Sequence, residues 1–261
     1  MRAGPAGDDP SVTSPYAQDG YRVAFDWSPI GAAEVRGDLV AVVDVLSFTT
    51  AVSVAVDAGI EVLPYRWRDD SARTFAEQHE AALAVGRGQA GDDGISLSPV
   101  TIRRARVRRL VLPSPNGSTI SQQLSDSGST VLAVSLRNAA AAAAWVATKL
   151  AEDPSLTVVA IAAGERWKDG SLRPAVEDLW GAGAFLAALA DGGAGPLSPE
   201  ARAAAAAYRD VAGELPTLLQ DCAGGRELTQ YGFPEDVAIA AEMNSSRLVS
   251  ILQGGVFKPV D

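Results

Sequence analysis

An alternation between two kinds of segment constrains the fold of this chain more than any other feature. Short runs rich in β-branched residues, typical of buried strands, occupy residues 21–27, 39–45, 60–63, 109–112, 130–134 and 156–161. Longer segments rich in Ala and Leu, typical of helices, occupy residues 49–58, 71–85, 118–125, 138–151 and 175–190. Continuous apolar strands that alternate with helices indicate βαβ units. We therefore predict an α/β fold with three α/β/α layers and a mostly parallel sheet.

The composition changes twice along the chain. Residues 1–20 are rich in Gly, Pro, Ser and Asp and lack an apolar core, which predicts a disordered tail rather than a secretory signal. Residues 21–190 form the predicted α/β core. Residues 191–261 form a predicted helical C-terminal portion, with helices over 199–213, 217–223 and 234–242 and a strand-like end at 256–260. Segment 191–196 either links two domains or is a long loop within one.

Charge and residue counts exclude several classes of function. The 261 residues carry a formal net charge of −10, which argues against a general nucleic-acid binder but permits a locally positive pocket for a small anion. The single cysteine, Cys222, excludes an intramolecular disulfide, and the single histidine, His79, excludes a multi-histidine metal site. No stretch is apolar for long enough to span a membrane. We expect a cytoplasmic protein, with a homo-oligomer as the default for a soluble enzyme.

Ligands of open α/β sheets bind beyond the carboxyl ends of the strands, where this sequence places polar clusters. The first cluster contains Asp44, at the end of a strand, and Thr49 and Thr50, at the start of a helix. A carboxylate there can hold Mg²⁺, and the hydroxyl groups can bind phosphate oxygens. The structural alternative is that Asp44 or Ser47 caps the helix.

The second cluster, Asn116-Gly117-Ser118, follows the strand at 109–112 and precedes a helix. Gly117 lets the backbone approach a ligand closely, and Ser118 supplies a hydroxyl group. The alternative is an Asn-Gly turn with a serine cap.

Two further clusters follow later strands. Glu177 and Asp178 open a helix after the loop that begins at Gly164-Glu165-Arg166. Paired carboxylates at that position suit a divalent cation or proton transfer, or they only complement the helix dipole. Arg137 and Asn138 supply a cation and an amide after the strand at 130–134, or cap the next helix. The clusters meet at one edge if the sheet is parallel.

Five short motifs occur in an order that resembles a known family. They are Val-Val-Asp-Val-Leu-x-x-Thr-Thr at 42–50, Asn-Gly-Ser at 116–118, Ser-x-x-Asn-Ala at 135–139, Ala-Gly at 163–164 with Glu-Asp at 177–178, and Phe-Pro-Glu-Asp-Val at 233–237. Together these motifs resemble the 2-phosphosulfolactate phosphatase (ComB-like) family over residues 35 to 260. The resemblance implies an α/β fold and Mg²⁺-dependent hydrolysis of 2-phospho-3-sulfolactate to sulfolactate and phosphate.

The sequence departs from the family pattern at three places. Ser47 stands where the family usually has an arginine, Ala162 stands where it tends to have a cysteine, and the Gly-Glu-Arg loop is reduced to Gly86-Arg87. An arginine is a natural partner for phosphate or sulfonate. Arg87 or Arg137 compensates for the missing arginine, or the substrate is another phosphate ester.

The resulting hypothesis is metal-assisted transfer of a phosphoryl group from a small anionic substrate to water. Mg²⁺ is held by Asp44 with Glu177 or Asp178, and the catalytic residues are Asp44, Arg137 and Glu177. The substrate is bound by Thr49, Thr50, Arg87, Asn116, Gly117, Ser118 and Asn138. The sequence leaves open direct attack by water against a phosphoenzyme on Asp44. The competing hypothesis is a non-catalytic relative that binds phosphoanions.

Overall fold

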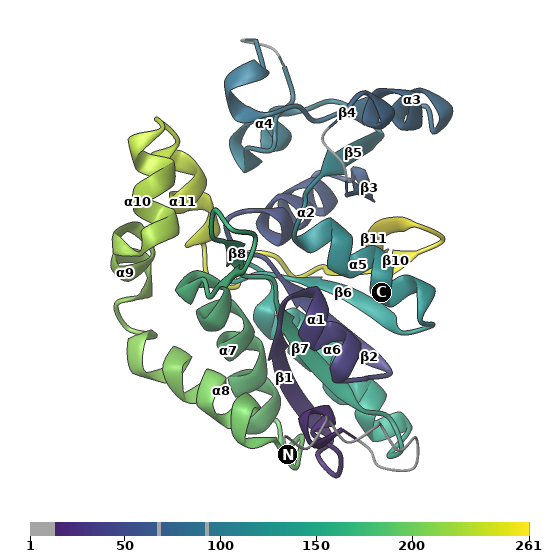
Figure 1. Ribbon diagram of the computed structural model, residues 1–261, viewed down its shortest axis with the longest axis vertical. Coiled ribbons are helices and arrows are strands. Elements are labelled where there is room, and N and C mark those ends of the chain that lie inside the picture. Colours follow the sequence, from purple (N-terminus) through teal and green to yellow (C-terminus); the bar gives the residue numbers. More distant parts are fainter. Residues whose placement is uncertain (1–13, 67–68, 92–93, 261) are drawn as a thin grey trace, which may run out of the picture.

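The computed structural model describes residues 14–66, 69–91 and 94–260, which form a nine-stranded sheet with helices on both faces (Figure 1). The strands in spatial order are β1 (Val23–Trp27), β7 (Val158–Ala162), β2 (Leu39–Val43), β6 (Thr130–Val134), β10 (Val249–Gln253), β11 (Val256–Val260), β3 (Glu61–Tyr65), β5 (Arg109–Pro113) and β4 (Ala82–Leu83). The predicted α/β fold with a mostly parallel sheet is confirmed.

The sheet consists of two parallel sets of strands joined by an antiparallel hairpin. β1, β7, β2 and β6 pair in parallel, and so do β3, β5 and β4. The β10–β11 hairpin lies between them and is antiparallel to β6 on one side and to β3 on the other. Three successive reversals make the second set run opposite to the first. The expectation that the polar clusters meet at one edge assumed a parallel sheet. The sheet is instead parallel within each set and antiparallel between the sets.

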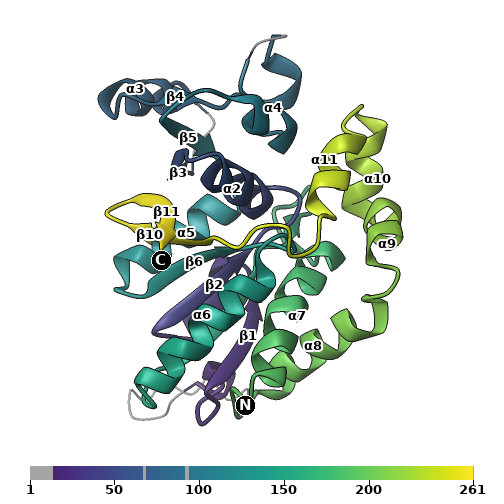
Figure 2. The same cartoon turned by 180° about the vertical axis from the view of Figure 1, so that it is seen from behind.

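Alternate residues of the strands face two hydrophobic layers. Val40 and Val42 pack toward α1 (Ser28–Glu34), α2 (Phe48–Asp57), α4 (Pro99–Arg104) and α5 (Gly117–Asp126). Ala41 and Val43 pack toward α6 (Ala139–Glu152), α7 (Val176–Asp191) and α8 (Pro199–Val211), which cover the other face (Figure 2). A strand that is buried on both faces reads as a continuous apolar run, which is why these strands could be predicted from the sequence.

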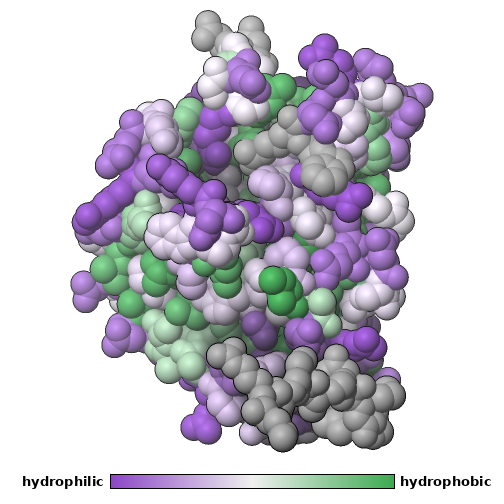
Figure 3. Space-filling model, viewed as in Figure 1, coloured by the Kyte–Doolittle hydropathy of each residue, from purple (hydrophilic) through white to green (hydrophobic). Residues whose placement is uncertain are grey.

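The alanine-rich sequence allows α7 and α8 to pack closely. A Cβ atom at Gly183 of α7 would lie 2.3 Å from the backbone oxygen of Ala204 in α8. Apolar residues gather over these two helices at the lower left of Figure 3, whereas hydrophilic residues cover much of the upper part of the same face. The small side chains here serve the approach of one helix to the other.

The C-terminal portion contains four helices and then returns to the sheet. After α8, the chain forms α9 (Leu215–Asp221), α10 (Ala223–Gln230) and α11 (Pro234–Ala240), and ends in the β10–β11 hairpin. Segment 191–196 packs against β1, because Pro196 accepts hydrogen bonds from the backbone N–H groups of Arg22 and Val23 at 3.0 and 3.2 Å. The predicted strand at 256–260 is β11, which pairs with β3 in the same sheet as the strands of residues 21–190.

Several local predictions differ from the structure. The helix predicted at 71–85 is α3 (Asp70–Gln78) followed by β4, because Glu80 adopts a left-handed conformation with φ 51° that ends the helix. α1, α4 and α10 are further helices. Of the predicted disordered tail, residues 1–13 lie outside the described residues, and Pro15–Ala17 form a short 3₁₀ helix.

No helix within the described ranges is both long and apolar enough to cross a lipid bilayer.

The position of the hairpin makes a prediction about stability. Phe257 in β11 is fully buried and meets the Phe48 ring edge-on, with 6.1 Å between ring centroids. Phe257→Ala should lower the free energy of unfolding by about 3 to 5 kcal/mol, because it opens a cavity at the centre of the sheet. Urea denaturation measures this, with Tyr16→Ala, at a side chain that is 72% exposed, as the control. A loss below about 1 kcal/mol would contradict a central hairpin.

Candidate functional site

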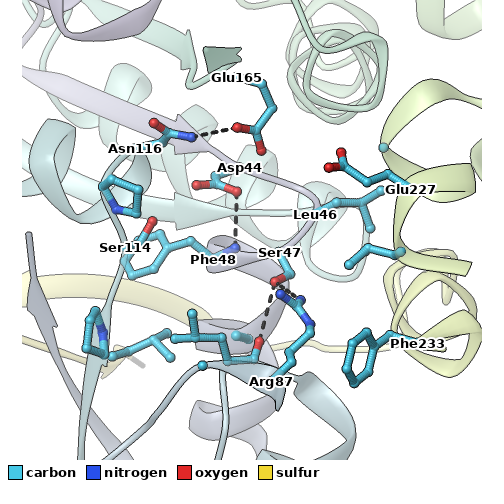
Figure 4. A pocket seen from close by; sticks show the side chains of 18 of the residues that line it. Asp44, Leu46, Ser47, Phe48, Arg87, Ser114, Asn116, Glu165, Glu227 and Phe233 are labelled. Atoms are coloured by element: carbon cyan, nitrogen blue, oxygen red, sulfur yellow. Dashed lines mark hydrogen bonds between the residues drawn. The ribbon is translucent and has the colours of Figure 1, made fainter. Parts of the chain in front are cut away.

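A cavity of about 410 Å³ lies where the loops after β2, β4, β5 and β7 meet α10 and the residues that follow it (Figure 4). Of the described residues that line it, four carry carboxylates (Asp44, Glu165, Glu177 and Glu227) and one carries a guanidinium group (Arg87). The apolar part of the lining includes Leu46, Leu97 and Phe233. The cavity therefore holds an excess of potential negative charge.

Asp44 joins the two oppositely directed sets of strands. It follows β2 and is 7% exposed, and its Oδ1 accepts a hydrogen bond from the N–H of Phe48 at the start of α2, at 3.1 Å. Its Oδ2 accepts the N–H of Gly117 at the start of α5, after β5, at 3.0 Å. Gly117 must lack a side chain, because a Cβ atom there would lie 2.3 Å from Cδ1 of Phe48. The N-termini of two helices thus stabilise the Asp44 carboxylate.

Glu165 faces the same end of the cavity from the short hairpin of β8 (Glu165–Arg166) and β9 (Leu172–Arg173). The Asn116 side-chain amide donates a hydrogen bond to its Oε2 at 3.1 Å (Figure 4). Burial, followed by the negative charge of Asp44, raises the pKa of Glu165 to about 7. Near neutral pH this carboxyl group can therefore hold or accept a proton.

Glu177 presents a buried carboxylate oxygen without a partner. The residue lies in the first turn of α7 and is 2% exposed. Its Oε1 packs against Gly224, where a Cβ atom would lie 2.2 Å away. Its Oε2 makes no hydrogen bond within the described part of the chain. A buried carboxylate oxygen without a hydrogen bond destabilises the folded protein. We therefore expect this atom to bind a ligand in the cavity.

The neighbouring Asp178 has a different role. Its Oδ1 accepts the N–H of Val45 at 2.7 Å, and its Oδ2 accepts the N–H of Gly164 at 2.9 Å. Burial, followed by the charges of Asp44 and Glu177, raises the pKa of Asp178 well above its usual value. Asp178 therefore ties the loop after β2 to the loop after β7 and does not line the cavity.

Arg87 lies at the opposite end of the cavity from Asn116 and Glu165 (Figure 4). Its Nη2 donates to Oγ of Ser47 at 2.6 Å, and its Nε donates to Oδ2 of Asp236 at 2.7 Å. The centre of the guanidinium group lies 5.7 Å from the centroid of the Phe233 ring. Two polar contacts and an aromatic face thus fix the orientation of this cation.

Comparison with known proteins identifies the same family that the motifs resemble. The family model described as 2-phosphosulpholactate phosphatase matches residues 29–255. The chain belongs to the 2-phosphosulpholactate phosphatase family. It is 31% identical to a protein of Cyanothece sp. (81% of this chain, 87% of the relative) and 29% identical to one of Thermosynechococcus vestitus (87% and 91%), each named "Probable 2-phosphosulfolactate phosphatase". A protein of Deinococcus radiodurans with the same name is 28% identical over 84% of this chain and 89% of its own length.

In this member of the family, the two threonines after Asp44 donate hydrogen bonds to backbone carbonyl oxygens. Thr49 Oγ1 donates to the carbonyl oxygen of Asp44 at 2.8 Å, and Thr50 Oγ1 donates to that of Val45 at 2.8 Å. Both side chains are fully buried and neither lines the cavity. The two hydroxyl groups fix the loop that presents Asp44, so the structure does not place them for the predicted contact with phosphate.

Three other predicted substrate-binding residues, Ser118, Asn138 and Gly117, also lie outside the cavity lining. Ser118 Oγ donates to the carbonyl oxygen of Leu112 at 3.1 Å, and Asn138 Oδ1 accepts the N–H of Ser135 at 2.8 Å. Gly117 uses its N–H for Asp44. These groups bind backbone atoms at strand ends, and neither α5 nor α6 has the side-chain cap that the sequence offered as the alternative. The structure brings Asp44, Arg87, Asn116 and Glu177 to the cavity.

Arg137 does not line the cavity either, because carboxylates elsewhere bind its guanidinium group. Its Nη2 donates to Asp57 of α2 at 2.8 Å, its Nη1 donates to Glu242, and its Nε donates to Oγ of Ser53 at 3.4 Å. The side chain is 5% exposed. Arg137 thus ties α2 to the segment after α11, and among the described arginines it is Arg87 that lines the cavity.

The predicted metal ligands do not form a three-residue set. Within the described ranges, no group of three His, Cys, Asp or Glu side chains is arranged to hold a metal ion together. Asp178 is occupied by two backbone amides, which leaves Asp44 and Glu177 of the predicted ligands at the cavity.

Sequence reasoning did not assign Glu165, Glu227 or Asp236 to the site. Glu165 follows a buried strand, so its position at a strand end was the available signal. Glu227 lies on α10, a helix that the sequence pattern did not predict. Asp236 lies in the Phe-Pro-Glu-Asp-Val motif, but its contact with Arg87 spans 149 positions of the chain.

The raised pKa of Glu165 predicts a pH dependence of stability. The folded protein binds a proton on Glu165 up to about pH 7, whereas the unfolded chain loses it near the ordinary pKa of 4.5. The folded state therefore holds more protons in this interval, and Glu165 makes stability fall as the pH rises through it. Glu165→Gln should remove this fall. At pH 8, the free energy of unfolding of the variant should gain about 2 kcal/mol relative to wild type, compared with the difference at pH 4.5.

Urea denaturation between pH 4.5 and 8 in EDTA measures the difference between the two proteins. Glu77→Gln, at an exposed position of α3, is the control. Parallel curves for wild type and Glu165→Gln would show that the carboxyl group has an ordinary pKa.

Proposed function

We propose that the protein is a Mg²⁺-dependent phosphatase that hydrolyses 2-phospho-3-sulfolactate to 3-sulfolactate and phosphate. Family membership and the names of the three relatives support the phosphatase and its substrate. We expect the enzyme to act in the cytoplasm, where the buried thiol of Cys222 stays reduced.

The excess of carboxylates over cations in the cavity is the observation that supports a metal ion. Four carboxylate side chains and one arginine line a space of about 410 Å³. A phosphate monoester is itself close to a dianion at neutral pH, so these carboxylates would repel it. A divalent cation between the carboxylates and the phosphate converts this repulsion into attraction, and phosphoryl-transfer sites use Mg²⁺ for this purpose.

The residues present fit such an ion. Mg²⁺ is usually held by one or two carboxylates, with waters and substrate phosphate oxygens as its other ligands, so a three-residue protein set is not required. The unpartnered Oε2 of Glu177 and the carboxylate of Asp44 are the ligands we assign to it. When bound, Mg²⁺ would polarise the phosphoryl group as a Lewis acid.

The protein side chains supply orientation and proton transfer. Asn116 holds the Glu165 carboxyl group at the cavity, and a pKa of about 7 suits this group to exchange a proton with water or with the leaving oxygen. Each oxygen of Asp44 accepts a backbone N–H, which stabilises the carboxylate and reduces its nucleophilicity. The proposed reaction is therefore direct attack by water, without a phosphoenzyme on Asp44.

Asp44→Asn is expected to lower phosphate release by more than about a hundredfold, because it removes a metal ligand while the residue keeps its size. EDTA should abolish release by the wild type, and added Mg²⁺ should restore it. A colorimetric phosphate assay with 2-phosphosulfolactate measures both effects. Mg²⁺ should also raise the Tm of the wild type more than that of Glu177→Gln.

Asp169→Asn, at an exposed position of the β8–β9 hairpin, is the matched control and should leave phosphate release unchanged. Full release by Asp44→Asn, or release that EDTA does not affect, would contradict the proposed metal site. Binding of phosphate without any turnover would instead identify a non-catalytic relative.

A further inference from the structure

The cavity has two chemically different ends. Asp44, Asn116 and Glu165 gather at one end, and Arg87 lies at the other beside Phe233 (Figure 4). We propose that Arg87 binds an acid group on the alcohol part of the substrate, and that Ser47 and Asp236 are positioning residues for its guanidinium group. This proposal rests on the proposed function, in which the phosphoryl group occupies the carboxylate end.

Asp236 fixes Arg87 from a buried position. It lies in the first turn of α11 and is 1% exposed, and its two oxygens accept hydrogen bonds from different side chains. Oδ2 accepts from Nε of Arg87 at 2.7 Å, and Oδ1 accepts from the hydroxyl group of Ser98. Because a buried ion pair is costly to break, Arg87 is held in place before a substrate arrives.

Ser47 sets the other edge of the guanidinium group. Its Oγ accepts from Nη2 of Arg87 at 2.6 Å, and its own hydroxyl group donates to the carbonyl oxygen of Leu97 at 3.4 Å. Ser47, Asp236 and Phe233 thus define one orientation in which the Arg87 side chain, 18% exposed, lines the cavity.

The distribution of charge separates the two anionic groups of a substrate. Arg87 is the single cation among the described lining residues, and the remaining charged groups are carboxylates. A carboxylate or sulfonate cannot compete with phosphate for a metal held at the carboxylate end and would be repelled there. The guanidinium fork matches the oxygens of either acid group. This division of charge assigns the acid group of the proposed substrate to Arg87 and its phosphoryl group to the carboxylate end.

Three esters test this assignment: 2-phosphosulfolactate, 2-phospholactate, which lacks the sulfonate, and isopropyl phosphate, which lacks both acid groups. Arg87→Gln should lower kcat/KM for 2-phosphosulfolactate about tenfold or more, and that for isopropyl phosphate less than about threefold. An unchanged kcat/KM for 2-phospholactate would assign the sulfonate to Arg87, and a reduced one would assign the carboxylate.

Equal losses for all three esters would show that Arg87 serves the phosphoryl group, and no loss for any of them would show that it binds nothing. Both results would overturn the proposal. Arg226→Gln, at an exposed arginine of α10 that lies outside the cavity lining, is the matched control.

The positioning residues are tested by the same selectivity. Asp236→Asn and Ser47→Ala should raise KM for 2-phosphosulfolactate and leave kcat/KM for isopropyl phosphate within about threefold, whereas a general structural defect lowers both. Adding Asp236→Asn to Arg87→Gln should cause little further loss, since the two residues act through one contact. Independent, additive losses would refute the positioning role.

A binding measurement separates this proposal from the proposed function. Titration calorimetry with 3-sulfolactate, which has no phosphate to release, should show weaker binding to Arg87→Gln than to the wild type. If the wild type hydrolyses no ester but this difference is found, the proposed function fails and the acid-group site stands. Hydrolysis together with equal binding of 3-sulfolactate by the two proteins would refute the site alone.

Discussion

The paired hydrogen bonds of Asp44 are the contact on which the site depends. One oxygen accepts the N–H that opens α2, and the other accepts the N–H that opens α5. These helices follow β2 and β5, which belong to strand sets that run in opposite directions. Asp44 therefore fixes where the carboxyl ends of the two sets meet, and the cavity forms at that junction. The lack of a side chain at Gly117 makes this approach sterically possible.

The same junction concentrates negative charge. Asp44 and Glu177 line the cavity with Glu165; burial raises the pKa of Glu165, and the charges of Asp44 and Glu177 raise it further. Asp178 does not line the cavity, and each of its oxygens accepts a hydrogen bond from a backbone amide. A site of this kind binds an anion poorly by itself and binds one well once a divalent cation is present. The fold thus brings carboxylates from strand ends and helix starts into one cavity, and this is the basis on which we propose a divalent cation there.

Much of the fold could be predicted from the sequence, because strands buried on both faces are continuous apolar runs. The strand at 130–134 and the one at 256–260 have the predicted bounds. The reversal between the two strand sets could not be predicted, since it depends on where the final hairpin inserts. Their places at strand ends pointed to Asp44, Asn116 and Glu177, and the family resemblance pointed to Arg87; all four line the cavity. Arg137 looked equally suitable, and only tertiary structure pairs it with Asp57 and Glu242.

Our central proposal is that a divalent cation strengthens the binding of phosphate in this cavity. Titration calorimetry of inorganic phosphate into the wild type, with saturating Mg²⁺ and with EDTA, tests it most directly. We predict binding that is at least about tenfold tighter with Mg²⁺, and a matching increase in Mg²⁺ affinity when phosphate is present, because such coupling is reciprocal. Equal phosphate affinity in Mg²⁺ and in EDTA would contradict the account.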